Sequence, residues 1–143
     1  MKTKLGWILF SIMTVIVIVL SSILVSYNVR WKSGDELLDL DKEDIESIYI
    51  TASDWSKPDF PTKRFVMNEE QIDYILKEFK SSKFERDNEG YGGGANGVHI
   101  QTTDGRNIVI TVYSKYINID HKQYVCHSYF TEYVRSFTYW GSP

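Results

Sequence analysis

The chain has 143 residues, with 16 basic and 19 acidic side chains and a formal net charge of −3 at pH 7. All of the acidic residues, but only 14 of the basic ones, lie after position 25. This acidic larger part argues against nucleic-acid binding, which needs a clustered positive surface. The single cysteine, Cys126, excludes a disulfide within the chain.

The segment from Leu5 to Val25 is an apolar run that holds no charged residue over 21 positions. As a helix it rises about 31 Å, which is enough to cross the hydrocarbon core of a bilayer. Aromatic residues mark both ends of the run, as expected of rings at the headgroup level: Trp7 at one end, and Tyr27 with Trp31 at the other. We therefore predict that residues 1–28 form a short tail and a transmembrane anchor that contacts membrane lipid.

A cleaved signal peptide is the main alternative, because Lys2 and Lys4 form a basic segment before the run. The run is longer than the apolar region of a signal peptide, and residues 24–26 (LVS) make a poor cleavage site. Arg30 and Lys32 follow the run, so the flanking positive charges are nearly balanced and do not decide the orientation. We expect an uncleaved, single-pass anchor in the cell membrane, with the C-terminal domain outside.

Residues 29–44 are predicted to be a juxtamembrane linker. The acids and leucines of residues 35–40 (DELLDL) favour one or two helical turns that pack on the following domain. Residues 45–143 are then long enough for one compact domain and not for two.

The domain is predicted to begin with two strands. Residues 45–51 alternate in polarity, with Ile48 and Ile50 on one face. A loop over residues 52–62 contains two of the three prolines, and a short strand follows at residues 63–67.

A helix is predicted from Asn68 to about Ser81. Asn68 is a good N-cap, and Gln71 stands three residues later, as a capping box requires. Met67 and Ile72 occupy the positions of a hydrophobic staple. Four residues have the spacing of a buried stripe: Ile72, Ile75, Leu76 and Phe79.

A hairpin is predicted over residues 98–113. A two-residue Asp104-Gly105 turn would mix polar and apolar side chains on both faces of the pair. A three-residue loop, Thr103-Asp104-Gly105, pairs even positions with even positions and gives one apolar face. We therefore predict the three-residue loop with a bulge and a left-handed Gly105.

The last elements are two short strands and a helix. Residues 117–119 and 123–126 form the strands, with Ile117 and Ile119 facing the core, and Ser128 caps the helix. The helix buries Phe130, Tyr133, Val134 and Phe137. Two helices on one face of a small antiparallel sheet are the economical packing, so the predicted fold is an N-terminal transmembrane helix followed by an α+β domain.

The glycine-rich stretch at residues 92–97 (GGGANG) formally matches the dinucleotide-binding pattern. That motif works because a helix N-terminus follows it and holds the pyrophosphate. Here a strand follows, so we expect a mobile loop that includes Gly92, Gly93 and Gly94, and no cofactor.

The histidines and the single cysteine are the candidate metal ligands and catalytic residues. His121, Cys126 and His127 are the candidate metal ligands, but adjacent Cys126 and His127 would point to opposite faces of a strand. The sequence has no second pair of Cys or His residues with the spacing of metal ligands. Cys126 with His99 or His121 is the conceivable nucleophile–base pair, but no pattern positions a base. We expect no metal, no catalytic residue and no enzyme, with a small surface hydrolase as the alternative.

The loop at residues 54–61 (DWSKPDFP) is the candidate partner-binding segment, through Trp55, Pro58, Phe60 and Pro61. Aromatic side chains beside prolines offer rigid contact area at low entropic cost. Alternatively, both rings fold back to cover an edge of the core. For the terminal residues 139–143 (YWGSP) three alternatives stay open: their aromatic rings pack on the domain, contact a partner or lie against the membrane.

Three segments, at residues 45–50 (IESIYI), 68–76 (NEEQIDYIL) and 103–108 (TDGRNI), resemble small Firmicute-type membrane-anchored surface proteins and lipoproteins of unknown function. The resemblance implies a Gram-positive, outward-facing β-α-β-meander domain over about residues 45–137, and it assigns no functional residues. This chain departs from the lipoprotein members because it has no cysteine at the anchor. We predict a non-catalytic extracytoplasmic binding or regulatory domain with a protein or peptide partner. The alternative is a structural subunit of a membrane complex.

Overall fold

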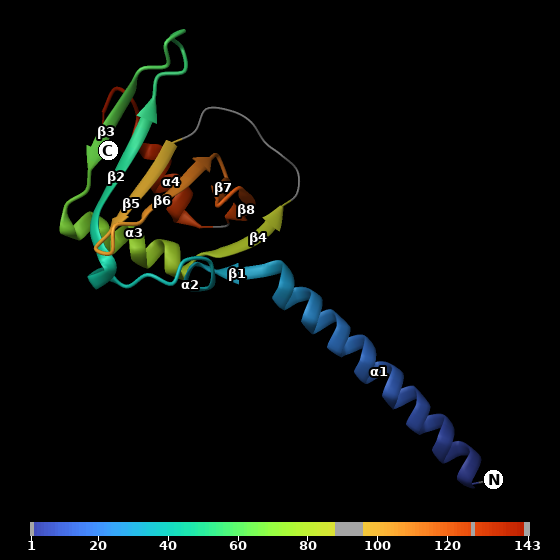
Figure 1. The fold of residues 1–143 in the computed structure, drawn as a ribbon. Helices are drawn as coiled ribbons and strands as arrows, with labels where there is room; N and C mark the ends of the chain where they lie inside the picture. Colours follow the sequence, from blue (N-terminus) through green and yellow to red (C-terminus); the bar gives the residue numbers. More distant parts are fainter. Residues whose placement is uncertain (1, 88–95, 127, 142–143) are drawn as a thin grey trace. The chain divides into compact units, whose positions relative to one another are not determined.

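The computed structural model describes residues 2–87, 96–126 and 128–141 (Figure 1). Within the first helix, the side chains of residues 2, 3, 5 and 27–30 are outside this description. The chain divides into two compact units, Met1–Trp31 and Lys32–Pro143. The predicted mobile loop at Gly92, Gly93 and Gly94 lies outside the described residues.

The first unit is the helix α1 (Lys2–Arg30), which contains an apolar segment, Gly6–Ser26, long enough to cross a membrane. The hydroxyl groups of Ser11, Thr14 and Ser22 each donate a hydrogen bond to the carbonyl group four residues earlier. These three hydroxyl groups therefore have their hydrogen-bond acceptors within the helix itself. The helix is consistent with a signal sequence or a single membrane anchor.

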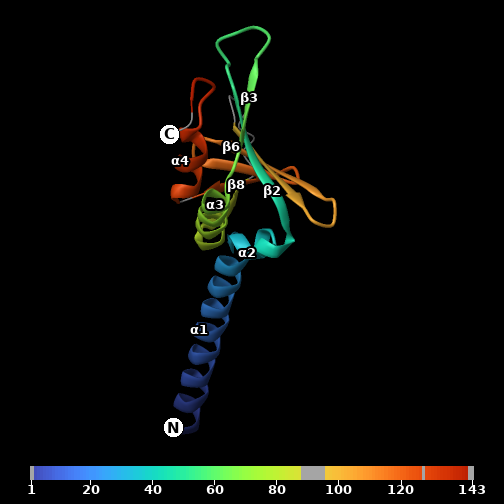
Figure 2. The ribbon, with the colours of Figure 1, turned by 90° about the vertical axis from the view of Figure 1, so that its left-hand side faces the viewer.

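The remaining elements follow in this order: β1 (Trp31–Ser33), α2 (Gly34–Leu37), a 3-10 turn η1 (Lys42–Asp44), β2 (Ile45–Ser53), β3 (Thr62–Val66), α3 (Glu69–Ser81), β4 (Lys83–Asp87), β5 (Asn96–Thr102), β6 (Asn107–Tyr113), β7 (Tyr116–Ile119), β8 (Lys122–Cys126) and α4 (Tyr129–Ser136). Within the described residues, the strands form one eight-stranded antiparallel sheet in the order β1-β4-β8-β7-β6-β5-β2-β3. Helices α3 and α4 lie on the same side of it (Figure 2). The predicted α+β fold is confirmed.

The core lies between the two helices and one face of the sheet. Strand β2 buries Ile48 and Ile50, and its alternate residues stay on the open face, as predicted. Helix α3 contributes Phe79, whose ring centroid lies 5.0 Å from that of Phe84 on β4 and 5.2 Å from that of Phe130 on α4. One aromatic ring therefore joins both helices to the sheet.

The β5–β6 hairpin has the predicted register. Ile100 pairs with Ile108, and the chain crosses between Thr102 and Arg106 through a three-residue loop. Gly105 has a φ of +86°, a left-handed conformation that glycine adopts without steric cost. The even-numbered side chains of the hairpin therefore face the core.

Helix α3 begins and ends where the sequence predicts. The Asn68 side chain accepts a hydrogen bond from the Gln71 N–H group at 2.9 Å, and the Gln71 side chain accepts one from the Asn68 N–H group at 3.0 Å. This reciprocal pair is the predicted capping box. The last helical residue is Ser81.

The final helix α4 is also capped as predicted, because the Ser128 hydroxyl accepts a hydrogen bond from the Phe130 N–H group at 3.2 Å. Phe130, Val134 and Phe137 are buried, and Tyr133 packs partly buried against the core. The pattern of apolar residues therefore identified the face of α4 that contacts the sheet.

Strand β4 was not predicted from the sequence. It pairs with β8, and its Phe84 lies in the core opposite Cys126. Charged residues occupy the other four positions of β4, so the segment has no apolar alternation that would indicate a strand. The segment forms a strand because it pairs with β8, and its own sequence pattern does not indicate one.

The segment predicted as a linker contains the expected helical turn and contacts the domain. Helix α2 has its own capping box between Ser33 and Glu36. Leu40 is buried in the core cluster, and the Lys80 ammonium group of α3 lies 3.4 Å from Asp35 and 3.0 Å from Asp41. The chain from residue 32 onward therefore packs as part of the second unit.

Candidate partner-binding surface

The loop between β2 and β3 consists of two successive tight turns. The Lys57 N–H group donates to the Asp54 carbonyl group at 3.4 Å, and the Phe60 N–H group donates to the Lys57 carbonyl group at 3.2 Å. The Asp54 N–H group closes the loop with a 2.9 Å bond to the Pro61 carbonyl group. Pro58 is exposed and Pro61 is half-buried, and each fixes its own φ angle. The loop is therefore ordered by its own backbone.

Asp54 is the buried side chain of this loop. One carboxylate oxygen, Oδ1, accepts hydrogen bonds from the Ser56 hydroxyl group at 2.5 Å and the Ser56 N–H group at 3.1 Å. These bonds to Ser56 hold the pKa of Asp54 below its usual value, against the opposing effect of burial. The carboxylate is therefore charged at neutral pH.

The rings of Trp55 and Phe60 lie against each other, with centroids 5.1 Å apart and planes at 45°. Trp55 is 51% exposed and Phe60 is 49% exposed. Both rings are therefore exposed to solvent and do not fold back over an edge of the core, although each ring shields part of the other. They present a preformed apolar area to solvent.

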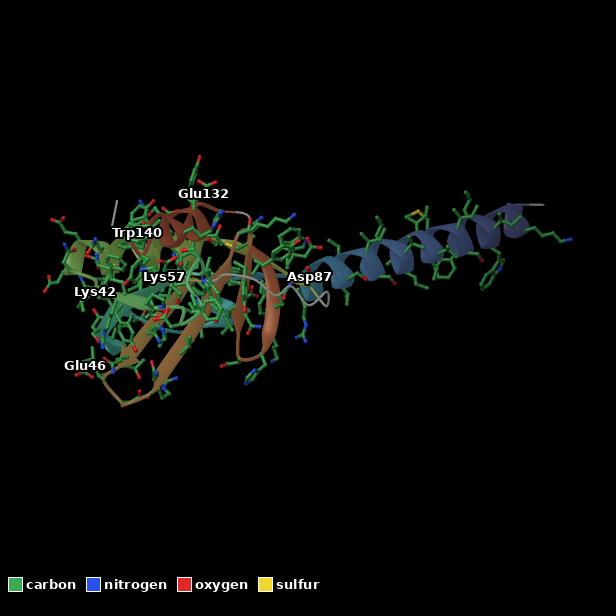
Figure 3. All side chains as sticks on the ribbon, turned by 90° about the horizontal axis from the view of Figure 1, so that it is seen from above. Lys42, Glu46, Lys57, Asp87, Glu132 and Trp140 are labelled. Atoms are coloured by element: carbon green, nitrogen blue, oxygen red, sulfur yellow. The ribbon has the colours of Figure 1, made fainter. Side chains whose placement is uncertain are left out.

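The C-terminal residues form a second turn beside this loop. Thr138 and Gly141 exchange backbone hydrogen bonds of 2.9 and 3.1 Å, which place Tyr139 and Trp140 at the tip. Trp140 is 76% exposed. The ammonium group of Lys57 lies 5.6 Å from the centroid of the Tyr139 ring and 5.4 Å from that of Trp140 (Lys57 and Trp140 are labelled in Figure 3).

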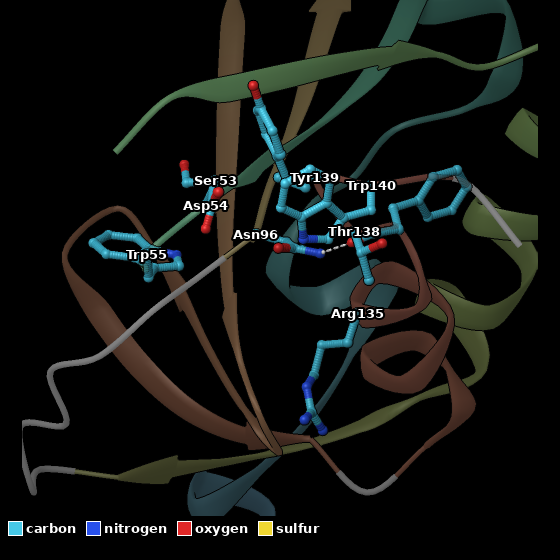
Figure 4. A pocket seen from close by; sticks show the side chains of 10 residues that line it. Ser53, Asp54, Trp55, Asn96, Arg135, Thr138, Tyr139 and Trp140 are labelled. Atoms are coloured by element: carbon cyan, nitrogen blue, oxygen red, sulfur yellow. Dashed lines mark hydrogen bonds between the residues drawn. The ribbon is translucent and has the colours of Figure 1, made fainter. Parts of the chain in front are cut away.

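A cavity of about 200 Å³ lies between the loop and the turn (Figure 4). The end of β2 with Trp55, the side chain of Asn96 and the segment from Arg135 to Trp140 form its walls. The Asn96 amide donates to the carbonyl groups of Val134 at 2.7 Å and Phe137 at 2.8 Å. These bonds satisfy the end of α4 and fix where the C-terminal turn begins.

We call the exposed rings of Trp55, Phe60 and Trp140, together with the half-buried Tyr139 and with Lys57, the aromatic surface. Trp55 and Phe60 were predicted from the sequence as binding residues, and the role of the C-terminal residues was left open. No role was predicted for Asp54, Lys57 or Asn96, which lie in or beside this surface. The Asp-x-Ser pattern at residues 54–56 is a signal for a side-chain turn that could have identified Asp54.

His99 lies on the open face of the sheet, where its ring stacks on that of Tyr49. The Thr51 hydroxyl group lies 3.2 Å from Nε2 of His99. Burial, followed by the charge of Arg64, lowers the pKa of His99. The imidazole is therefore neutral at pH 7.

The structure does not bring Cys126 together with His99. Cys126 is buried on the core face, where its sulfur lies 3.1 Å from the Ser128 hydroxyl group, and burial raises the pKa of its thiol. His121 lies in the turn between β7 and β8 and lines a separate hollow on the open face. Among the described residues, no group of three His, Cys, Asp or Glu side chains has the geometry of a metal site, and His127 lies outside them.

The three aromatic residues predicted at the membrane interface have different surroundings. Trp7 is exposed on α1 and contacts Phe10, with ring centroids 6.3 Å apart. Trp31 is half-buried at the start of β1. The side chain of Tyr27 lies outside the described part of the chain.

Comparisons with family models, curated proteins and solved structures found no match to this chain. The resemblance to small Firmicute-type surface proteins therefore stays a prediction from the sequence. The aromatic surface is identified by its geometry alone.

Proposed function

We propose that this chain is a single-pass membrane protein whose extracytoplasmic α+β domain binds a protein or peptide partner through the aromatic surface. The observation that supports the proposal is the exposure of Trp55, Phe60 and Trp140 on two neighbouring turns that are held by their own hydrogen bonds. Exposed aromatic residues on an ordered backbone are typical of binding hot spots, since little entropy is lost when they are covered.

The membrane part of the proposal rests on the apolar segment Gly6–Ser26, whose described side chains are all exposed. Within its own unit this segment is not buried, so lipid is the natural environment for it. Retention of the segment in the mature protein distinguishes an anchor from a signal peptide.

Protease accessibility on intact cells, combined with photo-crosslinking, tests the proposal. A photo-reactive amino acid at position 55 or 60 is expected to trap one partner. Protease added outside the cells is expected to digest the domain, while residues 5–25 are still present in the mature chain. The matched control places the same amino acid at position 109, since Val109 is exposed on the open face of the sheet. Trapping at all three positions alike, or at none, contradicts the assignment of the aromatic surface.

The alternative of a structural subunit predicts that contacts within the membrane carry the function. Replacing residues 5–25 with an unrelated transmembrane segment distinguishes the two. Retained function supports the binding domain, whereas lost function with correct insertion supports the structural subunit.

A further inference from the structure

The ammonium group of Lys57 lies among three groups that attract cations. Its Nζ is 3.6 Å from Oδ2 of Asp54, and the rings of Tyr139 and Trp140 have their centroids 5.6 and 5.4 Å away. A carboxylate combined with aromatic faces is the arrangement by which proteins recognise organic cations. The loop and the C-terminal turn therefore form a cation receptor, which in this structure holds the chain's own lysine.

The carboxylate of Asp54 has an oxygen atom to which a ligand could donate a hydrogen bond. Its side chain is only 5% exposed, and Oδ2 accepts no hydrogen bond from any residue in the described part of the chain. The distance to Lys57 Nζ is an ion-pair distance but exceeds that of a hydrogen bond. Because buried polar atoms in proteins are normally hydrogen-bonded, this oxygen is an acceptor for a donor from outside the chain.

We propose that this receptor binds a lysine or arginine side chain of the partner, and that Lys57 occupies it until the partner displaces it. This inference rests on the proposed function and names the chemistry of the same surface. The Lys57 side chain is 48% exposed, and exposed ion pairs of flexible lysines are weak. The high exposure of Trp140 leaves one ring accessible to an incoming side chain.

The second charge at the cavity does not oppose a cation at Asp54. Arg135 lines the cavity, but Figure 4 shows its guanidinium group directed away from Asp54. Asp54 therefore sets the charge preference at its own end of the cavity, beside Lys57 and the two rings.

The test uses the full chain in lipid nanodiscs and three short peptides. Acetyl-Gly-Lys-Gly-amide and acetyl-Gly-Arg-Gly-amide are cationic, and acetyl-Gly-norleucine-Gly-amide is a neutral match of the lysine peptide. The indole N–H signal of Trp140, assigned with Trp140→Phe, reports binding. We expect both cationic peptides to shift this signal, the neutral one to leave it unchanged, and Lys57→Met to tighten the cationic peptides about tenfold by removing the internal competitor.

Asp54→Asn keeps an oxygen that can accept the bonds from Ser56 but removes the charge, so it is expected to abolish binding of the cationic peptides. Asp59→Asn is the matched control, because Asp59 is an exposed carboxylate of the same loop and its loss changes the net charge equally. Far-UV circular dichroism checks that each variant is folded. Tyr139→Leu removes the other ring beside Lys57 but keeps the Trp140 signal, so it is expected to weaken the cationic peptides if Asp54→Asn does not fold.

Equal binding of the lysine and norleucine peptides, or an unchanged affinity in Lys57→Met, overturns the inference. If crosslinking from position 55 still traps a partner in that case, the proposed function stands without it. If the cationic peptides bind selectively but no partner is trapped, the receptor stands and the proposed function fails.

Discussion

The rings of Tyr49 and His99 stack across the β2–β5 pair, with centroids 4.5 Å apart and planes 5° from parallel. The guanidinium carbon of Arg64, on the neighbouring strand β3, lies 3.5 Å from the centroid of the Tyr49 ring. Tyr49 therefore contacts both a permanent cation and an imidazole that becomes a cation when protonated. The stack joins three strands on the face of the sheet opposite α3 and α4.

This geometry predicts that acid destabilises the domain through His99. The pKa of His99 lies below its ordinary value of 6.5, first because of burial and then because of Arg64. As the pH falls below 6.5, the unfolded chain takes up this proton before the folded chain does. The free energy of unfolding is therefore expected to be greatest above pH 6.5 and to fall as the pH decreases toward 5, measured by urea unfolding of the full chain in detergent micelles.

His99→Phe separates this contribution from the carboxylates and the other histidines. It keeps an aromatic ring against Tyr49 but cannot take up a proton. The variant is expected to lose less stability than the natural chain between pH 6.5 and pH 5. Identical pH dependence in both proteins would show that His99 does not contribute.

Asn68→Ala is expected to destabilise the domain by about 1 kcal/mol, because it leaves the Gln71 N–H group without its capping acceptor. Asn68→Ser restores an acceptor and is expected to recover most of the loss. The midpoint of urea unfolding, at constant slope, measures both effects. A loss as large in Asn68→Ser as in Asn68→Ala would argue against the cap as the cause.

Gly34→Ala is expected to destabilise the domain although alanine is the better helix former. A Cβ atom at Gly34 would lie 2.1 Å from the Phe79 carbonyl oxygen and 2.8 Å from Cα of Lys80, both rigid parts of α3. Overpacking against backbone costs about 1–3 kcal/mol, more than the helix propensity of one alanine returns.

Gly141→Ala is the matched control for Gly34→Ala, since a Cβ atom there has no neighbour within 4 Å. Urea unfolding of both variants is expected to show a lower midpoint for Gly34→Ala alone. Equal stability of the two variants would mean that α2 does not pack closely on α3.

Cys126 is expected to react with a thiol reagent only when the domain unfolds. Its thiol is buried beside Ser128, and burial raises its pKa, so both access and the thiolate fraction are low. Labelling by a maleimide with and without denaturant measures the difference. Rapid labelling of the folded chain would contradict the placement of Cys126 in the core.

Local sequence patterns identified much of this fold because the interactions behind them are local. The capping box of α3 needs only Asn68 and Gln71, and the length of the β5–β6 loop follows from the alternation on both sides of Gly105. The apolar face of α4 follows from helical periodicity. These features depend on residues a few positions apart, so they can be predicted from the sequence alone.

The candidate surface depended on residues far apart in the chain. Trp55 and Phe60 were recognised as aromatic residues beside prolines, but nothing local indicates that Lys57 lies against Tyr139 and Trp140. Asn96 likewise fixes the end of α4 from the start of another element. No periodicity relates these positions, so their meeting could not be predicted.

The sequence by itself determined the apolar helix, the class of the domain and the faces that its strands and helices bury, because periodicity and capping are properties of neighbouring residues. The tertiary structure alone decided that a charged segment becomes β4, that Tyr49 stacks on His99, and that the loop and the C-terminal turn share Lys57. The physical reason is that strand pairing and side-chain contacts between distant segments depend on the packing of the whole sheet against its helices, and local propensity does not determine that packing.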